Sequence, residues 1–175
     1  MAAETILDPD QKICDPHHHL MDNDWARYLL GDLLSDVAAG HRVVSTLYME
    51  TGDGYRDAGP EKLRPVGEVE HVLAQPAPPG IMQGIVAFAD LRLGDDVEEV
   101  LDAHEAVAGA RFSGIRFMSA WDVDPAFNLL HFVDGPGILS QPGYRRGARA
   151  VGRRGLPIDC WVFGHQLADV EHAPA

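Results

Sequence analysis

The sequence is poor in cysteine, in aromatic residues and in positive charge. Its 175 residues include 2 cysteines, 7% aromatic residues, and 14 Lys and Arg against 27 Asp and Glu, for a formal net charge of -13. Cys14 and Cys160 form no CxxC pair and no short-spaced framework, so we expect two reduced, buried thiols. The acidic balance argues against nucleic-acid or membrane-surface partners unless a basic face is strongly segregated.

Long hydrophobic runs are also absent. No apolar stretch approaches the roughly 18 residues that a membrane helix needs, and residues 1–12 lack the basic and hydrophobic regions of a secretory signal. We therefore expect a cytoplasmic protein. Hydrophobic residues make up 46% of the chain, which is enough for the packed core of one domain or of part of a larger one.

The chain does contain a regular alternation of short apolar segments with segments of helical period. We expect strands at 13–19, 43–50, 81–89, 112–118 and 156–163. Helices are predicted after Asp32 as N-cap, after Pro60, over 97–108, and from Pro142 to a stop at Gly155.

This alternation predicts an α/β fold with a parallel sheet, because parallel neighbours require crossover connections. Five strands suit either an open doubly wound sheet or the first five of the eight units of a TIM-type barrel, for which roughly 250 residues are typical. The pattern stops in mid-helix after residue 166. We therefore expect one domain over 1–175, incomplete at the C-terminus: a parallel (β/α) barrel truncated to about five units, its strands adjacent in chain order.

The first predicted strand ends in the stretch DPHHH at 15–19. Strand alternation puts Asp15, His17 and His19 on one face and His18 on the other. Two imidazoles at i and i+2 can bind one metal ion, and Asp15 can fix a ring tautomer by a hydrogen bond. The alternative is a histidine cluster without a ligand, or the remnant of a tag. We expect the His17 and His19 ring nitrogens to meet in the concave interior, with His18 toward the helices.

The segment ICDPHHHLMD at 13–22 resembles the first strand of the amidohydrolase-related (amidohydrolase 2) family of TIM-barrel hydrolases. YMET at 48–51, SGIR at 113–116, and 156–162 followed by Gln166-Leu167 occur in the order expected for that family. The resemblance covers nearly the whole chain but only the first five of eight units. Within the family, this pattern is similar to lactonases acting on sugar acids and dicarboxylates.

The resemblance also implies a set of site residues. His17 and His19 match the metal-ligand pair of the first strand, which implies a divalent, zinc-like metal. His165 lies one place from the expected fifth-strand ligand, and later ligands are absent, so the site is incomplete; some related lactonases are thought to need no metal. Glu50 and His165 become candidate catalytic residues. Arg116 becomes a candidate clamp for a substrate carboxylate.

Each of these residues has a structural alternative. Arg116 can form a salt bridge to a neighbouring acid, and a structural ion pair is the stronger expectation for Glu50. We expect His104 and Trp161 in the core. His41 and His71 are expected to be solvated, and so is a helix face bearing five arginines: Arg145, Arg146, Arg149, Arg153 and Arg154.

The sequence therefore predicts a hydrolase in which an activated water attacks a lactone or amide that carries a carboxylate. Its partner is a small-molecule substrate. The alternatives are a non-catalytic partial barrel, or one piece of a split barrel completed by another polypeptide or by a second copy. Since a catalytic zinc-type site needs about three protein ligands, we expect weak metal binding and little turnover from this chain alone.

Overall fold

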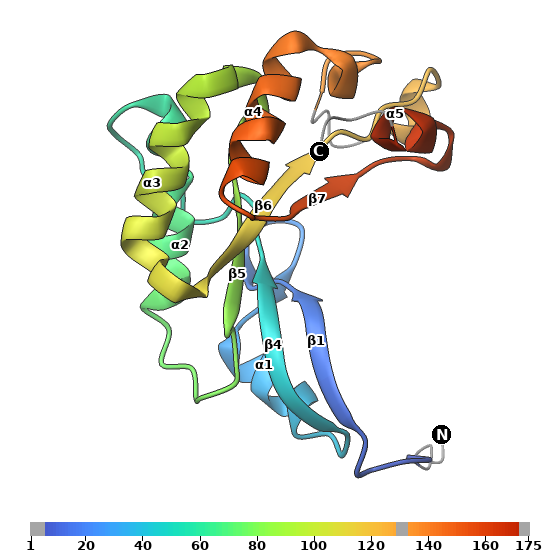
Figure 1. The fold of residues 1–175 in the computed structure, drawn as a ribbon. Coiled ribbons are helices and arrows are strands. Elements are labelled where there is room, and N and C mark those ends of the chain that lie inside the picture. Colours follow the sequence, from blue (N-terminus) through green and yellow to red (C-terminus); the bar gives the residue numbers. More distant parts are fainter. Residues whose placement is uncertain (1–5, 129–132, 172–175) are drawn as a thin grey trace.

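The computed structural model describes residues 6–128 and 133–171. Over these residues the fold consists of a two-stranded antiparallel sheet, a five-stranded sheet and five α-helices (Figure 1). The small sheet is β2 (Met21–Asp22) and β3 (Arg27–Tyr28). The large sheet contains β1 (Lys12–His18), β4 (Arg42–Met49), β5 (Gly84–Phe88), β6 (Phe112–Met118) and β7 (Ile158–Trp161). The helices are α1 (Leu30–Val37), α2 (Val66–Leu73), α3 (Val97–Ala108), α4 (Pro142–Arg153) and α5 (Leu167–Glu171).

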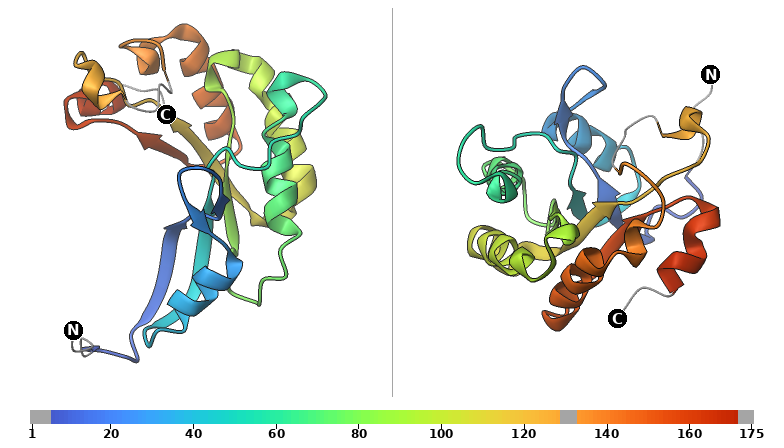
Figure 2. Two further views of the ribbon diagram at one scale, coloured as in Figure 1. Left: turned by 180° about the vertical axis from the view of Figure 1, so that it is seen from behind. Right: turned by 90° about the horizontal axis from the view of Figure 1, so that it is seen from above.

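The large sheet has the order β1-β4-β5-β6-β7, and all of its neighbouring strands are parallel. It curls, with helices α2, α3 and α4 along one face and an open, concave inner face on the other side (Figures 1 and 2). This arrangement is about half of a TIM-type barrel. The predicted fold class and the adjacent parallel strand order are confirmed.

Two helices begin where the sequence predicts and two do not. Helices α3 and α4 begin at Val97 and Pro142 as expected. Pro60 instead precedes a 3-10 turn, and α2 begins later, at Val66. Asp32 is not an N-cap: it lies inside the first turn of α1, where its carboxylate accepts the Leu29 backbone N–H at 2.8 Å. That bond satisfies a backbone donor at the helix start, which is what a capping residue does from outside.

The core lies between the sheet and its helices. Tyr48 and Ile85, neighbours on β4 and β5, are 2% and 0% exposed. Leu101 on α3 and Val151 on α4 are fully buried from the opposite side. Burial of this apolar surface is the main stabilising contribution. His104 on α3 shares the core at 0% exposure, with its Nε2 2.9 Å from the Phe88 carbonyl oxygen, which confirms it as a core histidine.

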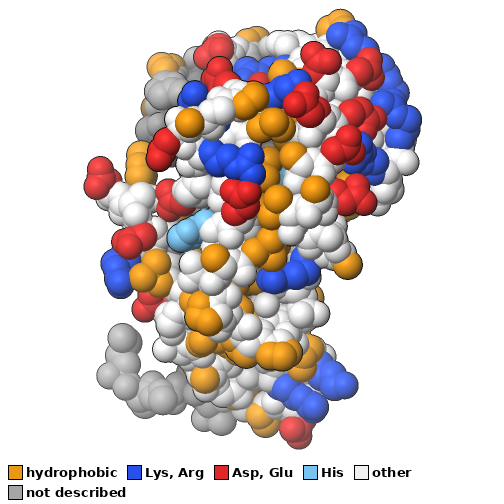
Figure 3. Space-filling model, turned by 90° about the vertical axis from the view of Figure 1, so that its left-hand side faces the viewer, with side chains coloured by type: hydrophobic (Ala, Val, Ile, Leu, Met, Phe, Trp, Pro, Cys, Tyr) orange, Lys and Arg blue, Asp and Glu red, His pale blue; other side chains and the backbone are white. Residues whose placement is uncertain are grey.

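Helix α4 packs closely on the segment before α3. A Cβ on Gly147 would lie 2.2 Å from the Leu91 carbonyl oxygen, so this position requires glycine. Three of the five arginines expected to be solvated are exposed, Arg146, Arg149 and Arg153, whereas Arg145 and Arg154, the residue just after α4, are half-buried. The Arg154 guanidinium donates to Glu98 and Asp102 of α3, each at 2.6 Å. Figure 3 shows Lys and Arg interspersed with Asp and Glu on this side of the molecule.

The turn into β5 holds Met82, a non-glycine residue with a φ of 52°. Its backbone N–H donates to the Thr46 hydroxyl at 2.8 Å, and its carbonyl accepts the Arg111 Nε–H at 3.0 Å. Met82 and Thr46 are both fully buried. A left-handed backbone is costly for such a residue and persists only where surrounding contacts impose it.

Within residues 6–128 and 133–171, no helix is both long and apolar enough to cross a membrane. His41 and His71 are exposed, as expected. Cys14 and Cys160 are free thiols, but Cys14 is exposed and Cys160 is half-buried, so the expectation of buried thiols was wrong. Strand alternation places Cys14 on the inner face of β1, and none of the helices among the described residues covers that face.

Candidate functional site

The end of β1 contains a bulge that sequence alternation does not predict. Asp15 pairs with Thr46 and His18 pairs with Tyr48, so three steps along β1 match two along β4. The extra residue in the bulge reverses the face on which the side chains before it lie, relative to those after it. Asp15 therefore shares the helix-facing side with His18 and not, as expected, the side of His17 and His19. Its Oδ1 accepts the His17 backbone N–H at 3.1 Å, and no hydrogen bond from it to a histidine ring occurs among the described residues.

His17 and His19 converge on the inner face. Their Nε2 atoms lie 3.2 Å apart, and their rings meet edge to face with centroids 4.9 Å apart. The His19 Nδ1 lies 2.8 Å from the Met49 carbonyl oxygen. Because a carbonyl only accepts, Nδ1 carries the hydrogen and Nε2 of a neutral His19 ring keeps a lone pair. The predicted meeting of the two rings is confirmed.

His18 lies on the opposite side of the strand. It is 7% exposed, its Nε2 is 2.9 Å from the Thr46 hydroxyl oxygen, and its ring packs edge to face near Tyr48. Burial lowers the pKa of His18 and also that of His19. The prediction that His18 faces the helix layer is confirmed. Of the three consecutive histidines, His18 packs against the helix-covered side, and His17 and His19 lie on the inner face.

Arg116 lies on the inner face of β6, directly opposite Asp159 in β7. Its Nε is 3.4 Å from the Asp159 Oδ1, and its guanidinium carbon lies 5.1 Å from the centre of the Trp161 ring. The salt bridge considered for Arg116 is thus present. Trp161 is 39% exposed, so its predicted place in the core was wrong. Strand alternation places its side chain on the same face as Asp159, where it contacts the Arg116 guanidinium.

Glu50 follows β4 directly and is 2% exposed. Neither of its carboxylate oxygens has a hydrogen-bond partner among the described residues, and no described salt bridge includes it. The structural ion pair expected for Glu50 was therefore wrong. Burial, followed by the charge of Glu68, raises the pKa of Glu50 to about 8, although Arg116 opposes this rise.

Glu68 and Asp159 were missed from the sequence. Glu68 lies on α2, is 2% exposed, and accepts hydrogen bonds from the Tyr48 hydroxyl at 2.8 Å and from the Thr51 N–H and hydroxyl at 2.7 and 3.0 Å. Burial raises the pKa of Glu68, and these hydrogen bonds oppose the shift. Two features of the sequence could have indicated them. Glu68 is a carboxylate among the apolar residues of a predicted helix, and Asp159 is a charged residue inside the fifth predicted strand.

His165 belongs to a different cluster. Its Nε2 lies 3.1 Å from the Trp121 carbonyl oxygen, and its Nδ1 lies 3.5 Å from an oxygen of Asp122. The neighbouring Gln166, 5% exposed, donates to the Ser119 carbonyl at 3.0 Å and accepts the Trp121 N–H. Both side chains thus hold the loop after β6 against the end of β7. None of the described contacts of His165 joins it to the pair formed by His17 and His19.

The His17–His19 pair fits two ligand positions of a metal ion. With metal–nitrogen bonds of about 2.1 Å, nitrogens at this separation subtend an angle of roughly 100°, between octahedral and tetrahedral values. Over residues 6–128 and 133–171, however, no group of three or more His, Cys, Asp or Glu side chains is arranged to hold a metal. The donors present therefore suit part of a site.

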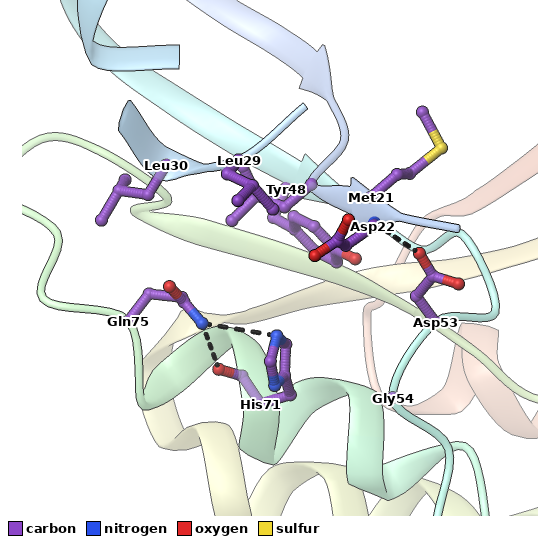
Figure 4. A pocket seen from close by; sticks show the side chains of 10 residues that line it. Met21, Asp22, Leu29, Leu30, Tyr48, Asp53, Gly54, His71 and Gln75 are labelled. Carbon is purple, nitrogen blue, oxygen red and sulfur yellow. Dashed lines mark hydrogen bonds between the residues drawn. The ribbon is translucent and has the colours of Figure 1, made fainter. Parts of the chain in front are cut away.

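A separate hollow of about 220 Å³ lies between the small sheet and α2 (Figure 4). Asp53 closes one side by accepting the Asp22 N–H at 3.2 Å and the Asn23 amide at 2.9 Å. His71 of α2 and Gln75, two residues after the end of that helix, lie on its other side (Figure 4). Neither member of the histidine pair lines this hollow.

No family model matches the chain. A search of solved structures finds an amidohydrolase 2 protein from Bifidobacterium longum subsp. infantis, with a TM-score of 0.53 and 21% identity over 93% of this chain and 56% of that one. The chain shares the fold of an amidohydrolase 2 protein. This confirms the fold implied by the resemblance in the first strand.

Two further similarities accompany this amidohydrolase 2 fold. An uncharacterized protein, y4mH of Sinorhizobium fredii (strain NBRC 101917 / NGR234), is 28% identical over an alignment of 182 positions that covers 91% of this chain and 57% of that protein. A probable 2-pyrone-4,6-dicarboxylic acid hydrolase from Acinetobacter baumannii, with citric acid bound, has a TM-score of 0.47 and 13% identity over 84% of this chain and 48% of its own. The chain thus spans about half the length of the proteins that it matches.

Proposed function

We propose that this chain forms the first strands of an amidohydrolase 2-type hydrolase that opens a lactone carrying a carboxylate group. The observation that carries the proposal is the convergence of the His17 and His19 nitrogens, 3.2 Å apart, on the same inner face as Arg116. Active sites of barrel enzymes lie at the carboxyl ends of the strands, where these side chains are found. The shared fold supports this assignment.

Each residue has a distinct part in the proposed reaction. Arg116 binds the substrate carboxylate through the nitrogens that Asp159 does not engage, and the Trp161 ring fixes the plane of its guanidinium. His17 and His19 hold the attacking water at their nitrogen atoms, while the Met49 carbonyl keeps the His19 ring in position. A divalent ion bound by the same pair would lower the pKa of that water.

The alternative is that the chain binds carboxylates without turnover on its own. The absence of a three-ligand group among the described residues favours it, since a catalytic zinc-type site has about three protein ligands. In that case a completing polypeptide, or a second copy, would pair with the open edges of β1 and β7. Unpaired strand edges are templates for such association.

Hydrolysis of carboxylate-bearing lactones by the purified chain, with and without Zn²⁺ or Mn²⁺, separates the two possibilities. Turnover that falls at least about 100-fold in both His17→Ala and Arg116→Ala would support the hydrolase. His41→Ala, at an exposed histidine outside the inner face, is the matched control and should keep the native rate. Carboxylate binding without turnover would favour the binding protein, and neither binding nor turnover would refute both.

A further inference from the structure

Two buried carboxylates lie behind the inner face and differ in their surroundings. Glu50, after β4, and Glu68, on α2, are each 2% exposed. Glu68 accepts three hydrogen bonds, one from Tyr48 and two from Thr51. Glu50 accepts none from the described residues. A carboxylate out of water remains ionised only where donors or positive charges compensate it.

This difference places the negative charge of the pair on Glu68 and a proton on Glu50. The groups that act on Glu50 come from several elements: Glu68 on α2, Tyr48 on β4, Tyr55 in the loop after β4, Arg116 on β6 and Asp159 on β7. Tyr48 and Tyr55 are neutral, because burial raises the pKa of both. Arg116 already has Asp159 as its counter-ion. The pKa of Glu50, raised to about 8, agrees with this placement.

We propose that Glu68 is a positioning residue whose negative charge keeps Glu50 protonated, so that the positive charge of Arg116 remains available to a substrate carboxylate. This rests on the proposed function in so far as Arg116 is taken to bind a carboxylate. If Glu50 ionised, it would join Asp159 as a second anion near Arg116. The two would then offset the Arg116 charge and repel an incoming carboxylate.

The location of the proton can be measured without any substrate. Difference infrared spectroscopy of the whole chain should show the band of a protonated carboxylic acid at pH 7 that disappears as the pH rises through about 8. Glu50→Gln should remove the band. Glu68→Gln should move its disappearance to lower pH by about one unit or more, because the charge that opposes ionisation of Glu50 is gone. Glu70→Gln, on the exposed side of α2, is the matched control.

Binding of furan-2-carboxylate, a stable planar carboxylate, tests the consequence. Calorimetric affinity for the native chain and for Glu70→Gln should fall about tenfold or more between pH 7 and 9. Glu50→Gln should bind equally well at both values. The fall in Glu68→Gln should occur at a lower pH than in the native chain. The native chain and Glu50→Gln test the proposal even if Glu68→Gln does not fold.

The outcomes distinguish the role of Glu50 and Glu68 from the proposed binding of a carboxylate by Arg116. A native chain without the protonated band, or a pH dependence that survives in Glu50→Gln, would overturn the role of the pair. The expected band without carboxylate binding at any pH would overturn the proposed function of Arg116, and with it the role assigned to Glu68, while leaving the proton on Glu50. The expected band together with a pH dependence confined to chains that retain Glu50 would support both.

Discussion

Polar side chains on the two faces of the five-stranded sheet differ in their hydrogen-bond partners. On the helix-covered face, the His18 ring meets the Thr46 hydroxyl and the Tyr48 hydroxyl donates to Glu68. On the inner face, His17 and His19 meet mainly each other, and Arg116 has its counter-ion at 3.4 Å. Satisfied polar groups fix one structure, whereas spare donors and acceptors are available to a ligand. Although the Nδ1 atoms of His18 and His104 have no partner among the described residues, the comparison predicts that substitutions on the helix-covered face lower stability most, and that the inner face is the one open to a ligand.

The largest expected effect tests where stability resides. Ile85→Ala, at a fully buried position on the helix-covered face, should lower the free energy of unfolding by about 2–5 kcal/mol, because a cavity replaces packed methyl groups. Leu47→Ala, on the inner face of the neighbouring strand, is the control and should cost about 1 kcal/mol. Urea unfolding measures both. Equal losses would contradict the division between the faces.

Metal addition tests the inner face. Zn²⁺ at ten times its dissociation constant should stabilise the chain by about 1.4 kcal/mol, measured as a rise in melting temperature. His17→Ala and His19→Ala should abolish that rise, while His17→Ala should change the metal-free stability by less than about 0.5 kcal/mol because His17 is exposed. His41→Ala should respond to Zn²⁺ as the native chain does. Persistence of the rise without His17 would place the metal elsewhere.

The pH dependence of stability tests Glu50, which is buried directly after β4. Its pKa is about 8 in the folded chain against 4.5 as its ordinary value, so between these values the folded state retains a proton that the unfolded chain has lost. The free energy of unfolding should therefore fall by about 1 kcal/mol from pH 7 to 8.

Three histidines also make stability depend on pH, and their contribution must be separated from that of Glu50. Burial lowers the pKa of His18, His19 and His104, so their opposite contribution lies below about pH 6.5. Denaturant titrations at pH 7 and 8 keep this contribution small. Glu50→Gln should show no fall over that interval, and a fall of native size in this variant would assign the effect to another group.

The smallest expected effect concerns the outer helices. Arg154→Ala removes the guanidinium that α4 shares with Glu98 and Asp102 of α3. Partly exposed ion pairs contribute little, so we expect a loss of about 0.5–1 kcal/mol that shrinks in 1 M salt. Thermal melts at low and high salt measure it. A loss that does not respond to salt would indicate packing by the arginine stem instead.

The sequence predicts the regular elements well, because strands and helices differ in the period of their apolar residues. The helix predicted at 97–108 and the strand predicted at 112–118 have those bounds in the structure. The sheet of β2 and β3 was missed because two-residue strands show no period. Similarly, the later start of α2 depends on a 3-10 turn that Pro60 does not distinguish from a helix.

The candidate site was predicted only where strand alternation applies. Alternation correctly joined His17 to His19, and it failed at Asp15 because the bulge shifts the face by one residue. The isolation of Glu50 and the hydrogen bonds of Glu68 depend on burial by other strands and helices. No local pattern contains that information. The roles proposed for Glu50, His165 and Arg116 remain predictions.

Met82 precedes β5, and its backbone conformation depends on contacts with segments on both sides of that strand. Its left-handed backbone is held by Thr46 and Arg111, which are 36 and 29 residues away in the sequence. Thr46 lies in β4 and Arg111 directly precedes β6, the two strands that flank β5. Neither partner is local, so this conformation arises only after both neighbouring segments are in place. The amide hydrogen of Met82 should therefore be among the slowest to exchange with solvent, because its release requires the sheet to open as a unit.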